Sequence, residues 1–201
     1  MAKIEMDRFS GLIIVDVQND FCPGGALAVK KGDRIIAPLN RYIPYFQAVR
    51  APIFATRDWH PKNHISFKDR GGPWPPHCVQ GTKGANLHPD LHIPYGTAVV
   101  AKGFLVDQDA YSGFQGTDLE ARLRENRIRR TFIGGLATDY CVKQTVLDSL
   151  TCGFETFLLE DAVQGVEVKR GDSKAAIEEM VKRGAKLIKL SGLKFVKLAR
   201  T

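Results

Sequence analysis

The sequence contains few cysteines and no long hydrophobic run, and both features exclude whole classes of protein. Its four cysteines lie at positions 22, 78, 141 and 152 with no C-x-x-C pair, so it lacks the zinc-knuckle and thioredoxin-like motifs. No apolar stretch approaches the ~20 residues that a membrane helix needs, and residues 1–7 carry no apolar signal-peptide stretch. We therefore expect a cytoplasmic protein with no membrane partner and no disulfides, in which each cysteine is by default a small buried hydrophobic residue.

Charge of one sign is in excess only near the C-terminus. The chain has 29 basic and 22 acidic side chains, and residues 167–201 hold ten of the basic and four of the acidic ones. A basic surface can bind nucleic acid. Here, however, the lysines of KLIKL (186–190) alternate with apolar residues, as on the solvated face of an amphipathic strand or helix. We therefore predict no nucleic-acid partner.

Short apolar segments alternate with helical patterns along the chain. The segments with the length and composition of strands are residues 11–15, 52–56, 97–101, 131–135, 155–159 and 185–188. The helical patterns occupy residues 33–49, 117–126, 139–150 and 172–183. Most of the apolar segments are nearly continuous, as in parallel strands buried on both faces. The pattern predicts a three-layer α/β/α fold with a six-stranded, mainly parallel sheet, formed by residues 1–201 as a single domain.

The segment from residue 58 to about residue 94 breaks this alternation. It is rich in proline, glycine, histidine and asparagine, and it contains both tryptophans and all five histidines of the chain. A loop of this length inside a compact domain is uncommon and is usually either functional or disordered. Because its aromatic residues argue against disorder, we expect an ordered excursion over the ends of the strands.

Chemically active side chains follow four of the expected strands. Asp16 comes after the first strand, Asp58 after the second, Lys102 after the third and Cys141 shortly after the fourth. In an open α/β sheet, ligands bind outside the carboxyl ends of the strands. We therefore expect these four side chains to converge at one edge of the sheet.

Cys141 is the candidate nucleophile of this edge. It falls just inside an expected helix with Thr138 or Asp139 as its cap, and a helix N-terminus stabilises a thiolate and lowers the pKa of the thiol. Backbone N–H groups of the same turn can hold an oxyanion. Asp16 can take the thiol proton, while Lys102 can stabilise both charges. The alternative is a buried structural cysteine at the start of a helix.

A second cluster has the side chains of a metal site. Asp58 and His60 lie at positions i and i+2, on the same side of an extended backbone, and His77 follows 17 residues after His60. One carboxylate and two imidazoles suit Zn²⁺, Fe²⁺ or Mn²⁺ and leave coordination positions open for water or substrate. The alternative for each histidine is a solvated or hydrogen-bonded side chain.

Five stretches of the sequence form an ordered set of motifs: IIVDVQNDFCPGGALAV (13–29), TRDWHPKNHISF (56–67), WPPHCVQGTKGANLHPDL (74–91), VAKGFLVDQDAYSGF (100–114) and GLATDYCV (135–142). With these motifs the chain resembles the nicotinamidases of the isochorismatase-like cysteine hydrolase superfamily. The resemblance covers residues 13 to about 160. It implies an isochorismatase-like, Rossmann-like fold, one divalent transition metal (Zn, Fe or Mn), and hydrolysis of nicotinamide to nicotinic acid and ammonia for NAD salvage.

The resemblance also implies roles for residues already named. These are a catalytic triad of Asp16, Lys102 and Cys141, and the metal ligands Asp58, His60 and His77. Some relatives add a further loop side chain to the metal shell, and His64 or Ser66 occupies that region here.

The resemblance further implies a substrate pocket and an oxyanion hole. Phe21 and Trp74 should sandwich the pyridine ring, and Tyr111 should close the pocket. The peptide bond before Ala137 should be cis, which would aim the N–H groups of Ala137 and Cys141 at the oxyanion.

Two other functions stay open on the sequence. Another amide or carbamoyl hydrolase of the same superfamily would keep the triad and act on a different substrate, but the D-x-H pair and the WPPH motif argue against it. A non-catalytic module that binds metal or nucleic acid would use the basic C-terminal segment, and the intact triad argues against that. A small-molecule substrate is the expected partner, and a homo-oligomer is compatible with the sequence.

Overall fold

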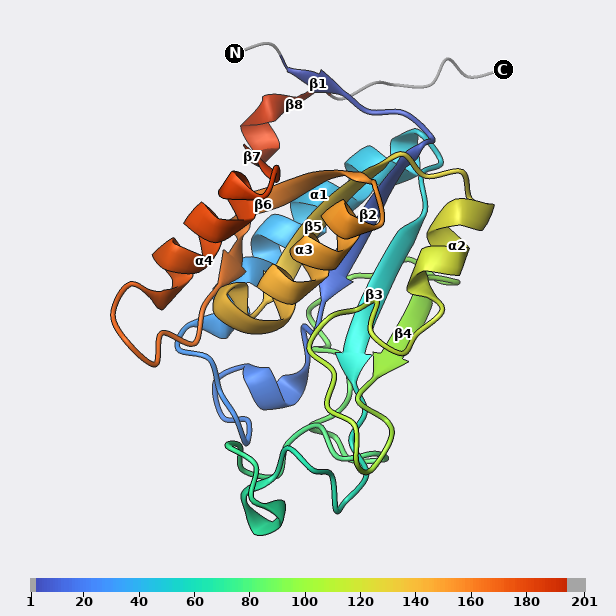
Figure 1. Ribbon diagram of the computed structural model, residues 1–201. Helices are drawn as coiled ribbons and strands as arrows, with labels where there is room; N and C mark the ends of the chain where they lie inside the picture. The colour runs from blue at the N-terminus through green and yellow to red at the C-terminus, as the bar shows by residue number, and fades with distance from the viewer. Residues whose placement is uncertain (1–2, 195–201) are drawn as a thin grey trace.

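The protein is built around a six-stranded parallel sheet, and its computed structural model describes residues 3–194 (Figure 1). The strands are β2 (Ser10–Val15), β3 (Ile53–Asp58), β4 (Ala98–Lys102), β5 (Arg130–Leu136), β6 (Glu155–Gln164) and β7 (Lys186–Ile188). Their order is β4-β3-β2-β5-β6-β7, and every neighbouring pair is parallel. All six expected strands are therefore confirmed.

Helices cover both faces of this sheet, which confirms the three-layer prediction. The helix α1 (Ile36–Ala48) packs on one face, whereas α2 (Leu119–Glu125), α3 (Lys143–Thr151) and α4 (Asp172–Lys182) pack on the other (Figure 1). Short helical turns are η1 (Asn19–Phe21), η2 (Gly32–Ile35), η3 (Lys68–Arg70), η4 (Thr138–Val142) and η5 (Leu190–Gly192). Among the residues that the structure describes, no helix is long and apolar enough to cross a membrane.

The central strand β2 shows why the apolar segments are continuous. Its side chains alternate between two cores: Leu12 and Ile14 belong to the core under α1, and Ile13 and Val15 belong to the core under α2, α3 and α4. All four side chains are fully buried. Each buried aliphatic side chain contributes about 1.5–3 kcal/mol, so a strand between two helical layers is stabilised by apolar side chains on both of its faces.

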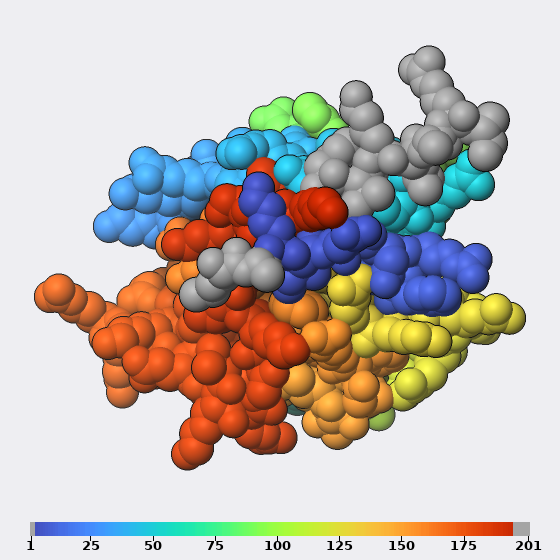
Figure 2. Space-filling model, turned by 90° about the horizontal axis from the view of Figure 1, so that it is seen from above, coloured from blue at the N-terminus to red at the C-terminus, as the bar shows by residue number. Residues whose placement is uncertain are grey.

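The structure adds two features that the sequence pattern did not predict. Strand β6 continues to Gln164, with a register shift against β5 between Ile133 and Gly135. A second, two-stranded parallel sheet pairs β1 (Ile4–Glu5) with β8 (Leu193–Lys194), so that the start of the chain lies against residues near 190 (Figure 2). Two-residue strands are too short to show a hydrophobic period.

The basic C-terminal segment is solvated where the structure describes it. Lys186 and Lys189 are exposed and pair with Glu155 and Glu160, and Ile188 and Leu190 are buried, as the pattern predicted, whereas Leu187 is exposed against the prediction. Residues 195–201, the last part of the segment 167–201 and of the proposed 1–201 domain, lie outside the described residues.

The segment between β3 and β4 lies at the carboxyl end of the sheet, as expected (Figure 1). Within residues 59–97 the only regular element is the short turn η3, and isolated bridges such as His60–Val79 and Phe67–Trp74 order the rest. The backbone is thus fixed by scattered hydrogen bonds rather than by a helix or a sheet ladder, and it brings its histidines to the strand ends.

Candidate active site and metal centre

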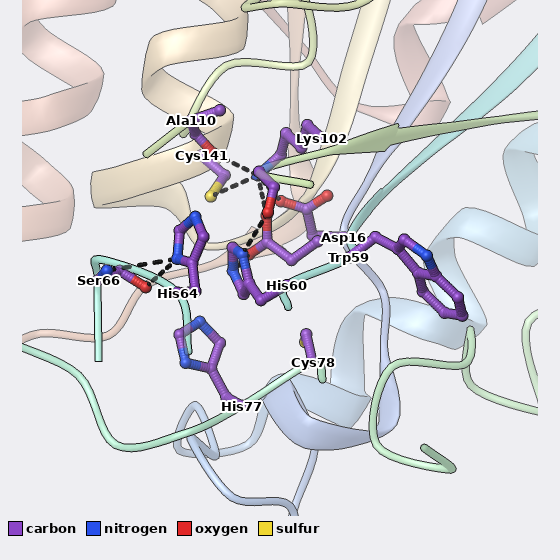
Figure 3. A network of polar contacts seen from close by, with 12 residues as sticks. Asp16, Trp59, His60, His64, Ser66, His77, Cys78, Lys102, Ala110 and Cys141 are labelled. Atoms are coloured by element: carbon purple, nitrogen blue, oxygen red, sulfur yellow. Dashed lines mark hydrogen bonds and ion pairs between the residues drawn. The ribbon is translucent and has the colours of Figure 1, made fainter. Parts of the chain in front are cut away.

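Lys102 is the centre of a buried polar cluster at the carboxyl ends of the strands (Figure 3). Its Nζ atom lies 2.9 Å from Oδ2 of Asp16, 2.5 Å from Oδ1 of Asp58 and 3.4 Å from Sγ of Cys141, and it donates a hydrogen bond of 3.1 Å to the carbonyl oxygen of Ala110. The lysine is fully buried. Burial alone would lower the pKa of Lys102, but the carboxylates of Asp16 and Asp58 outweigh it and raise that pKa well above its usual value, so the ammonium group stays charged.

Asp16 follows β2 and turns back towards the lysine. Its backbone φ is 50°, in the left-handed region, and Thr56 donates a hydrogen bond of 2.6 Å to its Oδ1 atom. Burial and the nearby Asp58 raise the pKa of Asp16 against the opposing effect of Lys102. One ligand atom each of Asp16, Asp58 and Cys141 lies within 4.8 Å of the others. A carboxylate with a raised pKa beside a thiol is suited to accept its proton.

Cys141 lies in η4, which is a π-helical turn without a side-chain cap. The expected cap was wrong: the carboxylate of Asp139 instead accepts hydrogen bonds from the N–H groups of Val166 and Glu167, both at 2.9 Å. The expected lowering of the thiol pKa was also wrong. Burial, helped by the charges of Asp16 and Asp58, raises the pKa of Cys141 well above its usual value against the opposing charge of Lys102. The resting sulfur is therefore a thiol, which needs a base.

Asp58, His60 and His77 converge on one point beside this cluster. Their ligand atoms all lie within 4.8 Å of one another, and the three side chains are buried. Nδ1 of His60 lies 2.8 Å from the carbonyl oxygen of Gly103, and Nδ1 of His77 lies 2.8 Å from that of Pro75. Because a carbonyl can only accept, each Nδ1 carries a proton, and in the neutral ring each Nε2 then has a free lone pair for a metal. Such outer contacts are typical of metal-ligating histidines.

The carboxylate of Asp58 belongs to both clusters. Its Oδ1 atom accepts from Lys102, while its Oδ2 atom lies 3.6 Å from Nε2 of His60. Burial would raise the pKa of Asp58, but Lys102 and His60 outweigh it and hold that pKa below its usual value. An ionised carboxylate and two imidazoles with free Nε2 atoms fit Zn²⁺, Fe²⁺ or Mn²⁺.

His64 and Ser66 lie beside this group rather than in it. The imidazole of His64 stacks on that of His60, with 4.1 Å between the ring centroids. Its Nε2 atom lies 3.0 Å from the carbonyl oxygen of Gln108 and must donate to it, so Nδ1 accepts the hydrogen bond of 2.7 Å from the hydroxyl of Ser66. Both nitrogens of His64 are thus engaged, and the structure places this pair as a support for the ring of His60.

A cavity opens onto both clusters. Its walls include the expected substrate-binding residues and members of both clusters: Phe21, Trp74, Tyr111, Ala137, Cys141, Asp58 and His77. The indole N–H of Trp74 donates a hydrogen bond of 2.9 Å to the hydroxyl of Tyr111, which fixes the two rings to each other. The peptide bond between Leu136 and Ala137 is cis, as expected.

Sequence reasoning missed several parts of this site. Five further side chains line the cavity: Leu27, Val29, Leu136, Tyr140 and Val166. The carbonyl groups of Gly103, Pro75, Gln108 and Ala110 also hold site residues. Tyr140 could have been found as the neighbour of Cys141, but backbone acceptors have no side-chain signature in a sequence.

Known proteins share this fold and sequence. Residues 10–191 match the family described as Isochorismatase domain. The nicotinamidase of Escherichia coli strain K12 is 42% identical, over 90% of this chain and 94% of its own. Among solved structures, the pyrazinamidase of Pyrococcus horikoshii in complex with zinc has a TM-score of 0.86 and 51% identity, over 90% of this chain and 99% of its own. PnC1 from L. infantum in complex with nicotinate has a TM-score of 0.88 and 38% identity, over 96% of this chain and 99% of its own.

The family match spans most of the chain, and the similar proteins cover nearly all of it with the same three-layer fold. The chain therefore belongs to the isochorismatase domain family.

Proposed function

We propose that this protein is a nicotinamidase, which hydrolyses nicotinamide to nicotinic acid and ammonia for NAD salvage. The observation that carries the proposal is one cavity lined by the thiol of Cys141, by Asp58 and His77 of the metal-ligand group, and by the aromatic rings of Phe21 and Trp74. A flat aromatic amide fits these walls, because its ring can stack between the aromatic side chains while its amide faces the thiol. The nicotinamidase and pyrazinamidase names of the similar proteins support the same substrate class.

In the proposed reaction Cys141 is the nucleophile and Asp16 is the base. Asp16 takes the thiol proton as the sulfur attacks the amide carbon, and the N–H groups of Ala137 and Cys141 donate to the oxyanion. The C–N bond then breaks, and the proton held by Asp16 passes to the leaving ammonia. A thioester with Cys141 remains. Water, deprotonated by Asp16, attacks the thioester, and the proton returns to the departing sulfur as nicotinic acid is released.

Lys102 stabilises charge in each of these steps. Its ammonium group lies against the sulfur of Cys141 and against the carboxylate of Asp16, so it offsets negative charge on either atom. With Lys102 and Asp58 charged and one proton shared between Asp16 and Cys141, the cluster carries a net charge of −1, and this charge does not change when the proton moves from Cys141 to Asp16.

The proposed metal ligands are Asp58, His60 and His77, with His64 and Ser66 supporting the ring of His60. A divalent transition metal bound there supplies an open coordination position that can take the ring nitrogen of the substrate and so orient the amide. Phe21 and Trp74 would hold the two faces of the ring, and Tyr111 would close the pocket through its hydrogen bond with Trp74.

The test is ammonia release from nicotinamide by the purified protein, measured before chelation, after removal of metal, and after addition of Zn²⁺, Fe²⁺ or Mn²⁺. We expect turnover that chelation removes and a metal restores. No ammonia release from the metal-loaded protein would reject the proposed substrate. In this proposal the chain forms one domain that binds a small-molecule substrate, needs neither nucleic acid nor a membrane, and is compatible with a homo-oligomer.

A further inference from the structure

Gln18 is a fully buried amide that lies between the two clusters without belonging to either. Its Nε2 atom donates to the carbonyl oxygen of Asp58 at 2.8 Å and to that of Ala85 at 2.9 Å. Its Oε1 atom accepts from the N–H group of Asp58 at 2.7 Å. Both backbone polar groups of the shared carboxylate residue are therefore bound by one side chain.

This arrangement replaces strand pairing at the point where the sheet ends. The last register partners of β2 and β3 are Ile14 and Ala55, and the N–H group of Asp16 still donates to the carbonyl of Thr56 at 3.3 Å. Asp16 then turns the chain, with φ at 50°, so the backbone of β2 no longer runs beside Asp58. The amide of Gln18 supplies the acceptor and the donor that two backbone groups of a continuing strand would have supplied.

The position of Asp58 affects both clusters, because its two carboxylate oxygens have different partners. One oxygen accepts from Lys102, and the other lies beside His60 in the metal-ligand group. A small rotation or shift of the Asp58 backbone would move both oxygens together. Lys102 is its register partner on β4, on one side, and the Gln18 amide holds the opposite side.

We infer that Gln18 is a positioning residue for Asp58, which sets the metal affinity and the alignment of Lys102. Only a primary amide of this length offers a donor to the carbonyl group and an acceptor to the N–H group of the same residue. A glutamate has nearly the same shape, but its ionised carboxylate would face the carbonyl oxygens of Asp58 and Ala85 with no N–H group to donate. A methionine keeps the length and loses every hydrogen bond.

The experiment compares Gln18→Glu and Gln18→Met with Gln80→Met as a matched control. Gln80 lies on a different loop, between β3 and β4, and its Nε2 atom makes one hydrogen bond of 2.9 Å to the carbonyl of Trp59, the residue next to Asp58. The primary readout is the Kd for Zn²⁺, from competition with a chromophoric chelator. Loss of an outer-shell partner typically weakens metal affinity by about 10–100-fold. We expect a loss of that size in both Gln18 variants and less than about twofold in Gln80→Met.

Kinetics at saturating Zn²⁺ give a second readout, and this part rests on the proposed function. We expect kcat for nicotinamide to stay reduced in the Gln18 variants after the metal site is filled, because Lys102 also loses its alignment. If the wild-type protein does not hydrolyse nicotinamide, the proposed function fails, yet the Zn²⁺ competition still tests Gln18. Wild-type Zn²⁺ affinity in a Gln18 variant whose melting temperature alone has fallen would overturn the inference.

Hydrogen exchange of the metal-free wild-type protein covers the case in which neither Gln18 variant folds. If Gln18 holds the Asp58 backbone, the Asp58 amide should exchange as slowly as the amides inside β3, before any metal is added. Exchange as fast as that of an exposed loop amide would overturn the inference without any variant.

Discussion

Asp58 and Lys102 are register partners at the ends of the neighbouring strands β3 and β4, and their side chains form an ion pair of 2.5 Å. Residues in register on parallel strands project to the same face, so this pair joins the metal-ligand group to the cluster of Asp16 and Cys141. Removing one partner of a buried pair leaves an uncompensated charge, which typically costs about 3–5 kcal/mol. A substitution in either cluster should therefore alter the charge balance and the geometry of the other.

Cys141→Ala should abolish turnover while the fold and the metal content stay intact. The thiol is the only group of the cluster that can form the thioester, so we expect kcat to fall at least ~10³-fold. Ammonia release, circular dichroism and metal analysis check the three parts. The control is Cys152→Ala, a partly buried cysteine at the end of α3, which should keep most of its activity. Residual activity of Cys141→Ala within tenfold of wild type would reject the thioester mechanism.

His77→Ala should lose metal and raise the KM for nicotinamide far more than Lys102→Ala does. The imidazole contributes one of three converging ligand atoms, whereas Lys102 contributes none. Metal analysis after dialysis and steady-state kinetics at fixed Zn²⁺ separate the two variants. A His77→Ala protein that retains wild-type metal content would show that the ligand assignment is wrong.

Benzamide should be a much poorer substrate than nicotinamide. It has the same ring shape and the same amide, so stacking against Phe21 and Trp74 would survive, but it lacks the ring nitrogen. A site that binds a polar group of its substrate discriminates strongly against the analogue that lacks this group. The loss in kcat/KM is far larger than the loss caused by removing one methylene group. We expect kcat/KM to be at least ~100-fold lower, or about 2.7 kcal/mol of transition-state binding. Comparable rates for the two amides, measured side by side, would show that the metal does not hold the ring nitrogen. The substrate would then have to be sought among other amides.

Activity should be lost on acidification at a higher pH than an ordinary aspartate would give. Burial raises the pKa of Asp16, so its carboxylate gains a proton earlier as the pH falls and can no longer accept one from Cys141. The acid limb of the kcat/KM profile should therefore lie above the usual aspartate value of about 3.9. Because acid also protonates His60, metal content is measured at every pH. An acid limb at or below the ordinary value, with metal retained, would contradict the assignment of Asp16 as the base.

The edge where the active groups meet could be predicted from the sequence. Buried parallel strands give nearly continuous apolar runs, so a polar residue at or just after the end of a run marks a strand end, and Asp16, Asp58 and Lys102 were found in this way. The direction of the Cys141 pKa shift could not be read from the same pattern. Its helical turn is visible in the sequence, but the burial that outweighs the turn and Lys102 depends on packing from the whole molecule.

Gln18 shows a second limit of the pattern. It lies inside a recognised motif, yet a glutamine after a strand has the same appearance whether its amide faces solvent or binds a peptide group forty residues away. The carbonyl acceptors of Gly103 and Pro75 are similar, because every residue carries one. Backbone direction in loops decides these contacts, and one sequence does not specify it.

The strand order gives the reaction a dependence on how the chain folds. Asp16 follows β2, Lys102 ends β4 and Cys141 follows β5, and these strands lie in the order β4-β3-β2-β5. The three groups meet only after both crossovers from β2 to β4 and the crossover to β5 have closed. Such non-local pairings form more slowly than helices, which need only local contacts. Turnover in a refolding chain therefore reports the assembly of these four strands, whereas far-ultraviolet dichroism rises as soon as the helices form.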